Sequence, residues 1–178
     1  MKRKSFPNFI LQPYNSIMLE IRKAISTDHD AIWDIIKDVI ATGDTYVFDP
    51  TSSKEKMLAY WCAPGTHTYI ARLNNALVGT FIIKDNQPDL GSHVANAGYM
   101  VSPLAAAQGI GKAMAAFSLE EAKILGYKAM QFNIVVKTNE RAVKLWQHLG
   151  FSIIGEIPAA FNHRVNGLTN AYIMYKKL

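Results

Sequence analysis

Cysteine is almost absent from this chain of 178 residues, because Cys62 is the only one. One cysteine cannot form a disulfide within the chain or build a multi-cysteine metal site, which excludes a secreted disulfide scaffold and favours a reducing, cytoplasmic setting. The sequence also lacks the run of about 18 apolar residues that a membrane-spanning helix needs. Since 49% of the residues are apolar and only 19% are charged, a globular core is expected and disorder is not.

The net positive charge is small outside the first few residues. The formal net charge is +5, but Lys2, Arg3 and Lys4 contribute three of these charges, so that +2 remains for the rest of the chain. No basic stripe interleaved with aromatic residues is left, and a nucleic-acid partner is therefore not expected. The five histidines show neither H-E-x-x-H nor paired spacing, so no metal site is expected.

Residues 1–17 form an N-terminal extension that is expected to be poorly ordered. Pro7 and Pro13 interrupt its short apolar stretch, which makes it too broken for a secretory signal. Met18 directly precedes the first strand-like segment, so a start codon chosen too far upstream and a genuine surface arm are both open interpretations. We expect residues 18–178 to form a single domain.

Extended and helical patterns alternate from Leu19 to the end of the chain. Two helices are expected to start at capping boxes, Thr27 with Asp30 and Ser52 with Glu55. The expected strands cover residues 19–23, 67–73, 77–84, 93–101, 128–136, 151–156 and 169–176, and the expected helices lie at about 27–43, 52–64, 109–125 and 139–150. The order β-α-α-β-β-β-α-β-α-β-β predicts an α/β fold with a mixed sheet, whose continuously apolar strand at 128–136 is expected to be buried on both faces.

The segment from Gln108 to Ala113 is the most informative motif, since it opens the third expected helix with two glycines. Glycines let the backbone approach a ligand closely, and the unpaired amides of a helix N-terminus attract anions. Met114 stands where a dinucleotide fingerprint needs its third glycine, and Ala113 stands where a P-loop needs Ser or Thr, so neither nucleotide motif applies. The segment predicts an anion site, with a glycine-rich helix start that binds no ligand as the alternative.

Two blocks of the sequence resemble the GCN5-related N-acetyltransferase (GNAT) family. Gln108, Gly111 and Ala113 fill the family's signature of Arg or Gln, two residues, Gly, one residue, and Gly or Ala, while residues 139–151 are similar to its asparagine-started helix that ends in Gly-Phe. The resemblance covers about residues 19–178. It implies a mostly antiparallel central sheet flanked by helices, and transfer of an acetyl group from acetyl-coenzyme A to an amine by direct attack on the thioester.

The resemblance also implies a site for acetyl-coenzyme A as co-substrate, without a metal. The backbone of Met100 and Val101 would pair with the pantetheine arm, and Asn139 would lie beside that arm. Because the loop before the glycine motif lacks the basic residues common in the family, contacts to the outer phosphate are expected to be weaker or to come from elsewhere. The pyrophosphate would be held by the amides of Gln108, Gly109, Ile110, Gly111, Lys112 and Ala113.

Asn96 and Asn133 interrupt apolar strand patterns. A buried amide costs free energy unless its donors and acceptors are satisfied, so each is expected to bind something. Bonding to backbone at a strand irregularity is one interpretation. The segments NAGYMV and FNIVVKTN resemble a narrower branch, the fungal proline-analogue N-acetyltransferases, and this implies that Asn96 and Asn133 are catalytic residues that contact the substrate and the reacting carbonyl.

Trp146 occupies a position where many family members carry a tyrosine that protonates the departing thiolate, so the resemblance leaves that role vacant. Packing in the apolar stripe of its helix is the alternative interpretation. His93 is the best-placed general base, with a simple surface or strand-end histidine as the competing interpretation. Tyr46, Phe48 and Phe161 lie in expected loops, where they either wall a substrate pocket or cover the core.

These observations together predict an N-acetyltransferase that acts on a small-molecule amine or an amino acid. A non-catalytic acyl-coenzyme A binding module and a protein N-terminal or lysine acetyltransferase are the alternatives. The sequence allows a homodimer, and it leaves the amine acceptor, the acyl chain and the oligomeric state open.

Overall fold

Seven strands form one sheet in the computed structural model, which describes residues 19–178. The elements follow the expected order, and the mixed α/β fold is confirmed. Within the described residues, no helix is both long enough and apolar enough to cross a membrane. The expected extension at residues 1–17 lies outside the described part. The elements are β1 (Leu19–Lys23), α1 (His29–Ile40), α2 (Lys54–Trp61), β2 (His67–Leu73), β3 (Ala76–Asp85), β4 (Val94–Val101), α3 (Ile110–Ile124), β5 (Ala129–Val136), α4 (Glu140–His148), β6 (Ser152–His163) and β7 (Gly167–Lys177).

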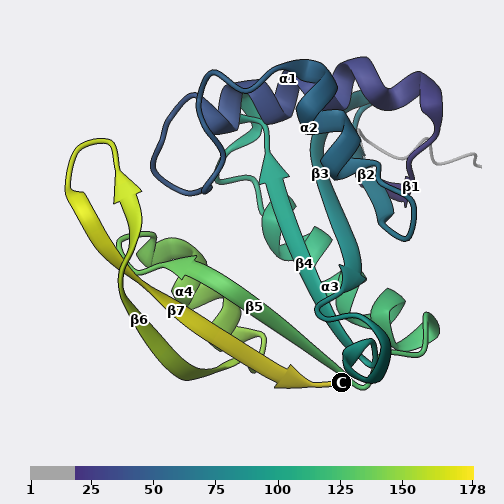
Figure 1. Ribbon diagram of the computed structural model, residues 1–178. Helices are drawn as coiled ribbons and strands as arrows, with labels where there is room; N and C mark the ends of the chain where they lie inside the picture. The colour runs from purple at the N-terminus through teal and green to yellow at the C-terminus, as the bar shows by residue number, and fades with distance from the viewer. Residues whose placement is uncertain (1–18) are drawn as a thin grey trace, which may run out of the picture.

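The sheet consists of two antiparallel runs that meet at β4 and β5. Its strand order is β1-β2-β3-β4-β5-β7-β6, and β4 and β5 run parallel to each other. Their ladder joins Val94 to Ala129 and Ala95 to Met130. Beyond these pairs the two strands diverge, as Figure 1 shows. We call the V-shaped gap between the diverging strands the V. Each of the two strands presents a row of backbone groups without a strand partner to this gap.

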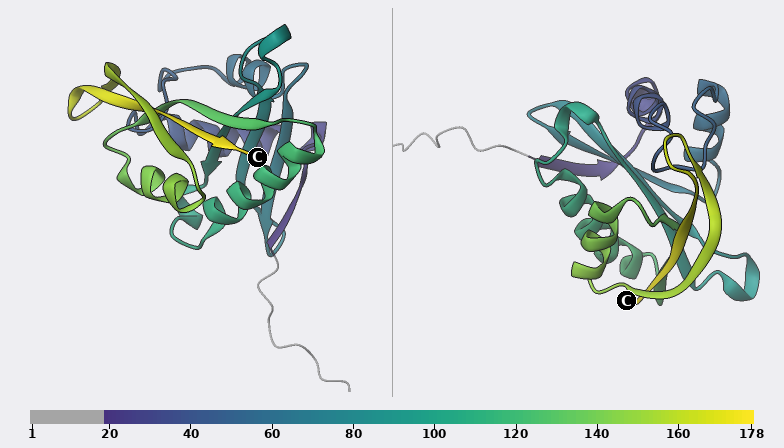
Figure 2. Two further views of the ribbon diagram at one scale, coloured as in Figure 1. Left: turned by 90° about the horizontal axis from the view of Figure 1, so that it is seen from below. Right: turned by 90° about the vertical axis from the view of Figure 1, so that its left-hand side faces the viewer.

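Helices α1 and α2 cover one face of the sheet, and α3 and α4 cover the other (Figure 2). Because alternate residues of a strand point to opposite faces, Phe81 packs toward α3, whereas its neighbour Ile82 packs toward α1 and α2. Two apolar cores result. Large buried side chains of the first are Tyr69, Phe81, Met114, Met130, Phe132 and Trp146, and those of the second are Ile32, Ile36, Ile40, Met57, Trp61 and Met100.

Neither expected capping box forms, because each helix begins later than its box requires. Ser53, rather than Ser52, caps α2, and its hydroxyl accepts a hydrogen bond from the Lys56 amide at 3.3 Å. Thr27 lies inside a 3₁₀ turn over Ser26–Asp28 that precedes α1. Serine or threonine before an acidic residue thus locates a helix start only to within about two residues.

Strand β6 is longer than expected, and Phe161 lies in it rather than in a loop. Phe161 is buried, so it belongs to the packed part of the sheet. The alternating pattern is broken before it, because the register with β7 shifts between Ile157 and Phe161 and Ala159 has a left-handed φ of +51°. Such a bulge interrupts the alternation of inward and outward residues, so the sequence pattern does not predict the second part of the strand.

Strand β5 is buried on both faces toward its two ends, but not along its whole length as the apolar run suggested. Asn133 and Ile134 are exposed, whereas Phe132 and Val135 are buried. The register with β7 shifts between Phe132 and Val135, and β4 no longer covers the other edge at this point. The divergence of β4 and β5 therefore exposes the middle of an apolar strand to the V.

Candidate functional site

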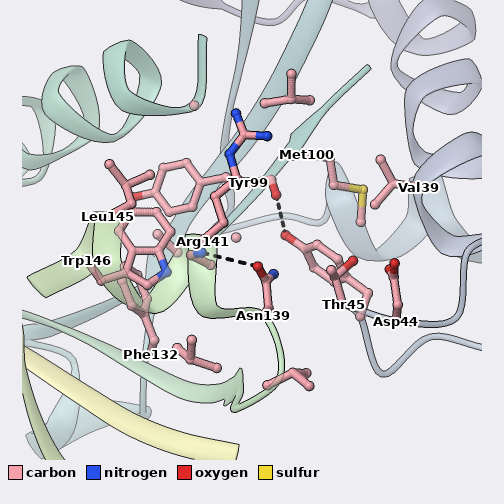
Figure 3. Close-up of a pocket in the computed structure, with 18 of the residues that line it drawn as sticks. Val39, Asp44, Thr45, Tyr99, Met100, Phe132, Asn139, Arg141, Leu145 and Trp146 are labelled. Atoms are coloured by element: carbon pink, nitrogen blue, oxygen red, sulfur yellow. Dashed lines mark hydrogen bonds between the residues drawn. The ribbon is translucent and has the colours of Figure 1, made fainter. Parts of the chain in front are cut away.

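A cleft with a volume of about 960 Å³ lies between the diverging strands and extends to the loop that joins α1 to α2. Figure 3 shows side chains that reach into it from β4, β5, α4 and that loop. It has two parts, which we name by position. The α3 half comprises cleft residues within 99–112 and 139–146, and the loop half comprises those within 44–48, 60–61, 96–98 and 133–134.

The start of α3 forms one end of the cleft. Gly109 precedes the helix with a left-handed φ of +79°, which a residue with a side chain rarely adopts. At Gly111 the backbone is ordinary, and an added Cβ would meet Val101 at 3.8 Å, a normal contact. The backbone conformation thus favours glycine at 109 but not at 111. A ligand that approaches the helix-start amides would explain the glycine at 111.

The amides of Ile110, Gly111 and Lys112 open α3 and have no preceding helical turn in which to find an acceptor. The amide of Ala113 differs from the expectation, because it donates to the Gly109 carbonyl at 3.0 Å. In the part of the chain that the structure describes, neither Gln108 nor Ala113 lines the cleft. The geometry therefore narrows the predicted anion site to Gly109 through Lys112.

The edge of β4 that faces the V exposes the backbone of alternate residues. The Ser102 amide donates to the Val78 carbonyl of β3 at 2.8 Å, and the antiparallel register then turns the backbone groups of Met100 toward β3 as well. The side chain of Met100 is buried beneath α1. Val101 faces the V as expected, whereas the backbone of Met100 does not, which corrects the expectation for that residue.

Asn139 precedes α4, where its Oδ1 accepts a hydrogen bond from the Ala142 amide at 3.2 Å (Figure 3). Because the cap uses only the side-chain oxygen, the Asn139 NH₂ group is left for the cleft. Lys112, Arg141 and Lys144 line the same half. Sequence reasoning missed Arg141 and Lys144, whose only signal is their spacing of three residues at the start of α4, and they supply positive charge that the loop before α3 lacks.

Aromatic side chains wall the loop half. Tyr46 stacks on Phe48 with ring centroids 5.8 Å apart, Phe48 meets Tyr60 edge to face at 5.0 Å, and Tyr46 meets Trp61 at 6.3 Å. The Tyr46 hydroxyl donates to the Tyr99 carbonyl at 2.9 Å, and burial raises the pKa of Tyr46, so that the phenol stays protonated. The expectation that Tyr46 and Phe48 wall a pocket fits this position.

Asn96 and Asn133 lie together where β4 and β5 diverge. Asn96 Nδ2 donates to the Gln131 carbonyl at 2.9 Å, and Asn133 Nδ2 donates to Asn86 Oδ1 at 2.8 Å. Gln131 Nε2 in turn donates to Asn133 Oδ1 at 2.9 Å. Both asparagines line the cleft, and one of them, Asn96, also bonds backbone. Sequence reasoning missed Asn86 and Gln131, because only strand pairing brings them to this place.

Trp146 lies in α4, and its side chain packs into the core between this helix and the sheet. Its ring lies 4.6 Å from Phe132 and 5.0 Å from Tyr99, and only 8% of the residue is exposed. His93 is exposed, its Nδ1 lies 3.1 Å from the Leu90 carbonyl oxygen, and it is not among the described residues that line the cleft. Across residues 19–178, no group of three or more His, Cys, Asp or Glu side chains could hold a metal ion.

The turn between β6 and β7 meets the loop after α1, as Figure 1 shows. The Arg164 amide donates to the Gly43 carbonyl at 3.1 Å, and Arg164 Nη1 donates to the Ala41 carbonyl at 3.4 Å. These bonds join two segments that lie on opposite arms of the V. The wide end of the V is therefore bridged by the hairpin turn.

Comparisons with known proteins agree with this architecture. The sequence model of the acetyltransferase (GNAT) family matches residues 32–151. The solved structure of a GCN5-related N-acetyltransferase from Kribbella flavida is 35% identical, has a TM-score of 0.86, and matches over 90% of this chain and 98% of that one. The structure of yncA from Salmonella typhimurium with acetyl-CoA, at 20% identity and a TM-score of 0.81, matches over 90% of this chain and 94% of its own and shares the fold.

A curated relative, N-acetyltransferase aca1 of Schizosaccharomyces pombe, is 37% identical over 112 residues. The match covers 62% of this chain and 54% of that protein, so it spans about half of the relative's length. The family match covers more than half of the present chain and includes the start of α3, the diverging strands and α4. This chain belongs to the GNAT acetyltransferase family.

Proposed function

We propose that the protein is an N-acetyltransferase that moves the acetyl group of acetyl-coenzyme A to the amine of a small molecule or an amino acid. The observation that carries this proposal is the course of the cleft. It passes between β4 and β5, with helix-start amides and three cations at one end and aromatic and amide side chains at the other. An anionic donor and an amine acceptor can therefore approach β4 from opposite ends.

The α3 half fits acetyl-coenzyme A. The amides of Ile110, Gly111 and Lys112 and the positive end of the helix dipole suit a pyrophosphate. The backbone of Val101 can pair with an extended, amide-bearing arm as an added strand would, and the Asn139 NH₂ group lies on the same side. When bound, acetyl-coenzyme A supplies an activated thioester.

The loop half has to hold a neutral amine and stabilise the negative charge that develops on the reacting oxygen. The side-chain amides of Asn96 and Asn133 can do this without titrating. Trp146 offers no acidic proton, but none is required there. The ordinary pKa of a thiol is about 8.5, so solvent can protonate a departing thiolate. We propose that Asn96 and Asn133 are the residues that act on the substrate.

A thiol-release assay with acetyl-coenzyme A tests the proposed function. Its acceptor panel comprises amino acids, polyamines, peptides with free N-termini and N-terminally blocked peptides that contain lysine. We expect release with a small amine or amino acid. Release only with peptides would replace the acceptor class by protein N-termini or lysine. Binding of acetyl-coenzyme A by calorimetry without release in any arm would make the protein a non-catalytic binding module.

We also propose that residues 18–178 form a single N-acetyltransferase domain that is active in a reducing compartment such as the cytoplasm. A protein that begins at Met18 should keep the melting temperature and the turnover of the full chain, since the elements that line the cleft all lie after it. A large drop in either would show that residues 1–17 support the domain or join subunits. Size-exclusion chromatography with light scattering shows whether the chain forms the homodimer that the sequence allows.

A further inference from the structure

Four side-chain amides form a continuous chain where β4 and β5 begin to diverge. We call Asn86, Asn96, Gln131 and Asn133 the amide cluster. Asn86 directly follows β3, Asn96 lies in β4, and the other two lie in β5. Only two of them, Asn96 and Asn133, line the cleft among the described residues. Asn86 and Gln131 stand behind them, so any influence they have on a substrate must pass through the other two.

A main-chain carbonyl fixes the direction of the whole cluster. The Gln131 carbonyl can only accept, so the atom of the Asn96 amide that faces it at 2.9 Å must be nitrogen. The second hydrogen of that nitrogen is directed at Asn86 Oδ1, at 3.4 Å. If the Asn86 amide were reversed, two NH₂ groups would face each other, which is unfavourable. Asn86 therefore presents its oxygen.

The same logic continues to Asn133. Because Asn86 Oδ1 accepts, the Asn133 atom 2.8 Å from it must be nitrogen. This turns Asn133 Oδ1 toward Gln131 Nε2, which donates to it at 2.9 Å. Every amide in the cluster is thus oriented by one backbone group that cannot flip.

The orientation leaves different atoms free on the two residues that line the cleft. Both hydrogens of Asn96 Nδ2 are used, so that residue offers its oxygen, which the structure pairs with nothing else among residues 19–178. Asn133 uses its oxygen and one hydrogen, and it retains one N–H. Asn96 has no hydrogen left and can therefore only accept from a ligand, whereas Asn133 is the one of the two that still has an N–H to donate.

We propose that Asn86 and Gln131 are positioning residues that fix this polarity, so that Asn96 accepts from the N–H of the incoming amine and Asn133 donates to the reacting carbonyl oxygen. The inference rests on the proposed function. In that reaction the amine nitrogen forms a bond to the acetyl carbon, the carbon–sulfur bond breaks, the thiolate leaves with the electron pair, and the amine proton passes to solvent. A reversed cluster would present a donor to the amine and an acceptor to the oxyanion, which opposes both steps.

Two amide-to-acid substitutions test the donor and acceptor orientation of the cluster. They introduce the same charge, so a difference between them reports the orientation and not the charge. Asn86→Asp keeps the required acceptor and cannot reverse, whereas Gln131→Glu removes the required donor. Either change removes a hydrogen bond that orients Asn133, so we expect Gln131→Glu and Asn86→Leu to lower kcat/KM for the acceptor about tenfold. Asn86→Asp should restore it to within about threefold of the wild type, with the Kd of acetyl-coenzyme A unchanged in all three. Equal losses in the two acids, or loss only in Asn86→Asp, would overturn the proposal.

A double-mutant cycle shows whether the residues act through Asn133. Once Asn133→Ala is present, Gln131→Glu should have little further effect, because the partner that it orients is gone. Additive losses would contradict a positioning role. If no amine is acetylated at all, the proposed function fails, but the polarity is still tested by thermal unfolding, where Gln131→Glu should melt lower than Asn86→Asp and the reverse order would overturn it.

Discussion

The two halves of the cleft are built from different parts of the polypeptide. The α3 half relies on main-chain groups that lie close together in sequence, from Val101 to Lys112. The loop half relies on side chains such as Tyr46, Trp61 and Asn133 that come from a loop, a helix and a strand far apart in sequence. A main-chain site needs only a backbone conformation that small residues allow, so a short motif reveals it. A side-chain site exists only after distant strands have paired.

The largest expected effect comes from breaking the α3 half alone. Gly111→Asp places a carboxylate where amides should meet a phosphate, and it should weaken the affinity for acetyl-coenzyme A about 100-fold, or about 2.7 kcal/mol. Gly111→Asn is the matched control, because it adds similar bulk without charge and should cost less. Both variants should fold, since a Cβ at 111 meets only Val101 at 3.8 Å. Calorimetric titration measures the Kd of acetyl-coenzyme A for each variant. An unchanged Kd in a folded Gly111→Asp variant would show that the start of α3 does not bind the pyrophosphate.

The converse experiment breaks the loop half. Asn133→Ala and Asn96→Ala should each lower kcat/KM for the true acceptor at least about tenfold, because a preorganised donor or acceptor is lost. The Kd of acetyl-coenzyme A should stay within about twofold of the wild type. Steady-state kinetics and calorimetry on the same preparations provide the comparison. Wild-type kinetics, or a collapse of thermal stability, would show these amides to be structural only.

A smaller effect is expected at the contact that joins the halves. Tyr46→Phe removes the hydrogen bond to the Tyr99 carbonyl and should cost about 1 kcal/mol of unfolding free energy. Burial raises the pKa of Tyr46 above that of an unfolded tyrosine, so this contribution is complete below about pH 10 and is lost as the pH rises through the folded-state pKa. Denaturant titrations from pH 7 to 11 should show the gap between wild type and variant closing at the alkaline end. A gap that widened there would contradict the assignment.

The smallest change in turnover is expected at Trp146. Its ring packs on Phe132 and Tyr99, so Trp146→Phe should lower thermal stability while kcat stays within about threefold. Trp146→Tyr is the informative companion, because it restores the phenol common at this position. Stopped assays of thiol release measure both variants. If Trp146→Phe alone lost activity tenfold at unchanged stability, the indole would have a direct role in the reaction.

The sequence was sufficient for the architecture and for most of the α3 half. The order of elements, the glycine-rich start of α3 and the helix start at Asn139 can all be read from local patterns, since each depends on neighbours in sequence. The amide of Ala113 and the backbone of Met100 could not be judged in this way. Whether an amide is free depends on the first helical hydrogen bond, and which way a strand turns its backbone depends on register with β3.

Fewer residues of the loop half could be predicted from the sequence. Asn96 and Asn133 stood out as polar residues in apolar strands, but Asn86 and Gln131 did not, because nothing local distinguishes them from ordinary polar residues in an extended strand. Their grouping follows from a parallel ladder that joins β4 to β5 over Val94 to Ala95 and then stops. Non-local pairing, rather than composition, creates this site.

The contact between Arg164 and Gly43 has a consequence for the size of the acceptor. The turn between β6 and β7 is hydrogen-bonded to the loop after α1, so the two arms of the V are joined at its wide end as well as at the β4–β5 ladder. An acceptor that enters from this end has to pass the joined segments. We therefore expect free small amines and chain termini to reach β4 more readily than the middle of a folded protein, and loosening the contact at Arg164 should widen the range of amines that enter.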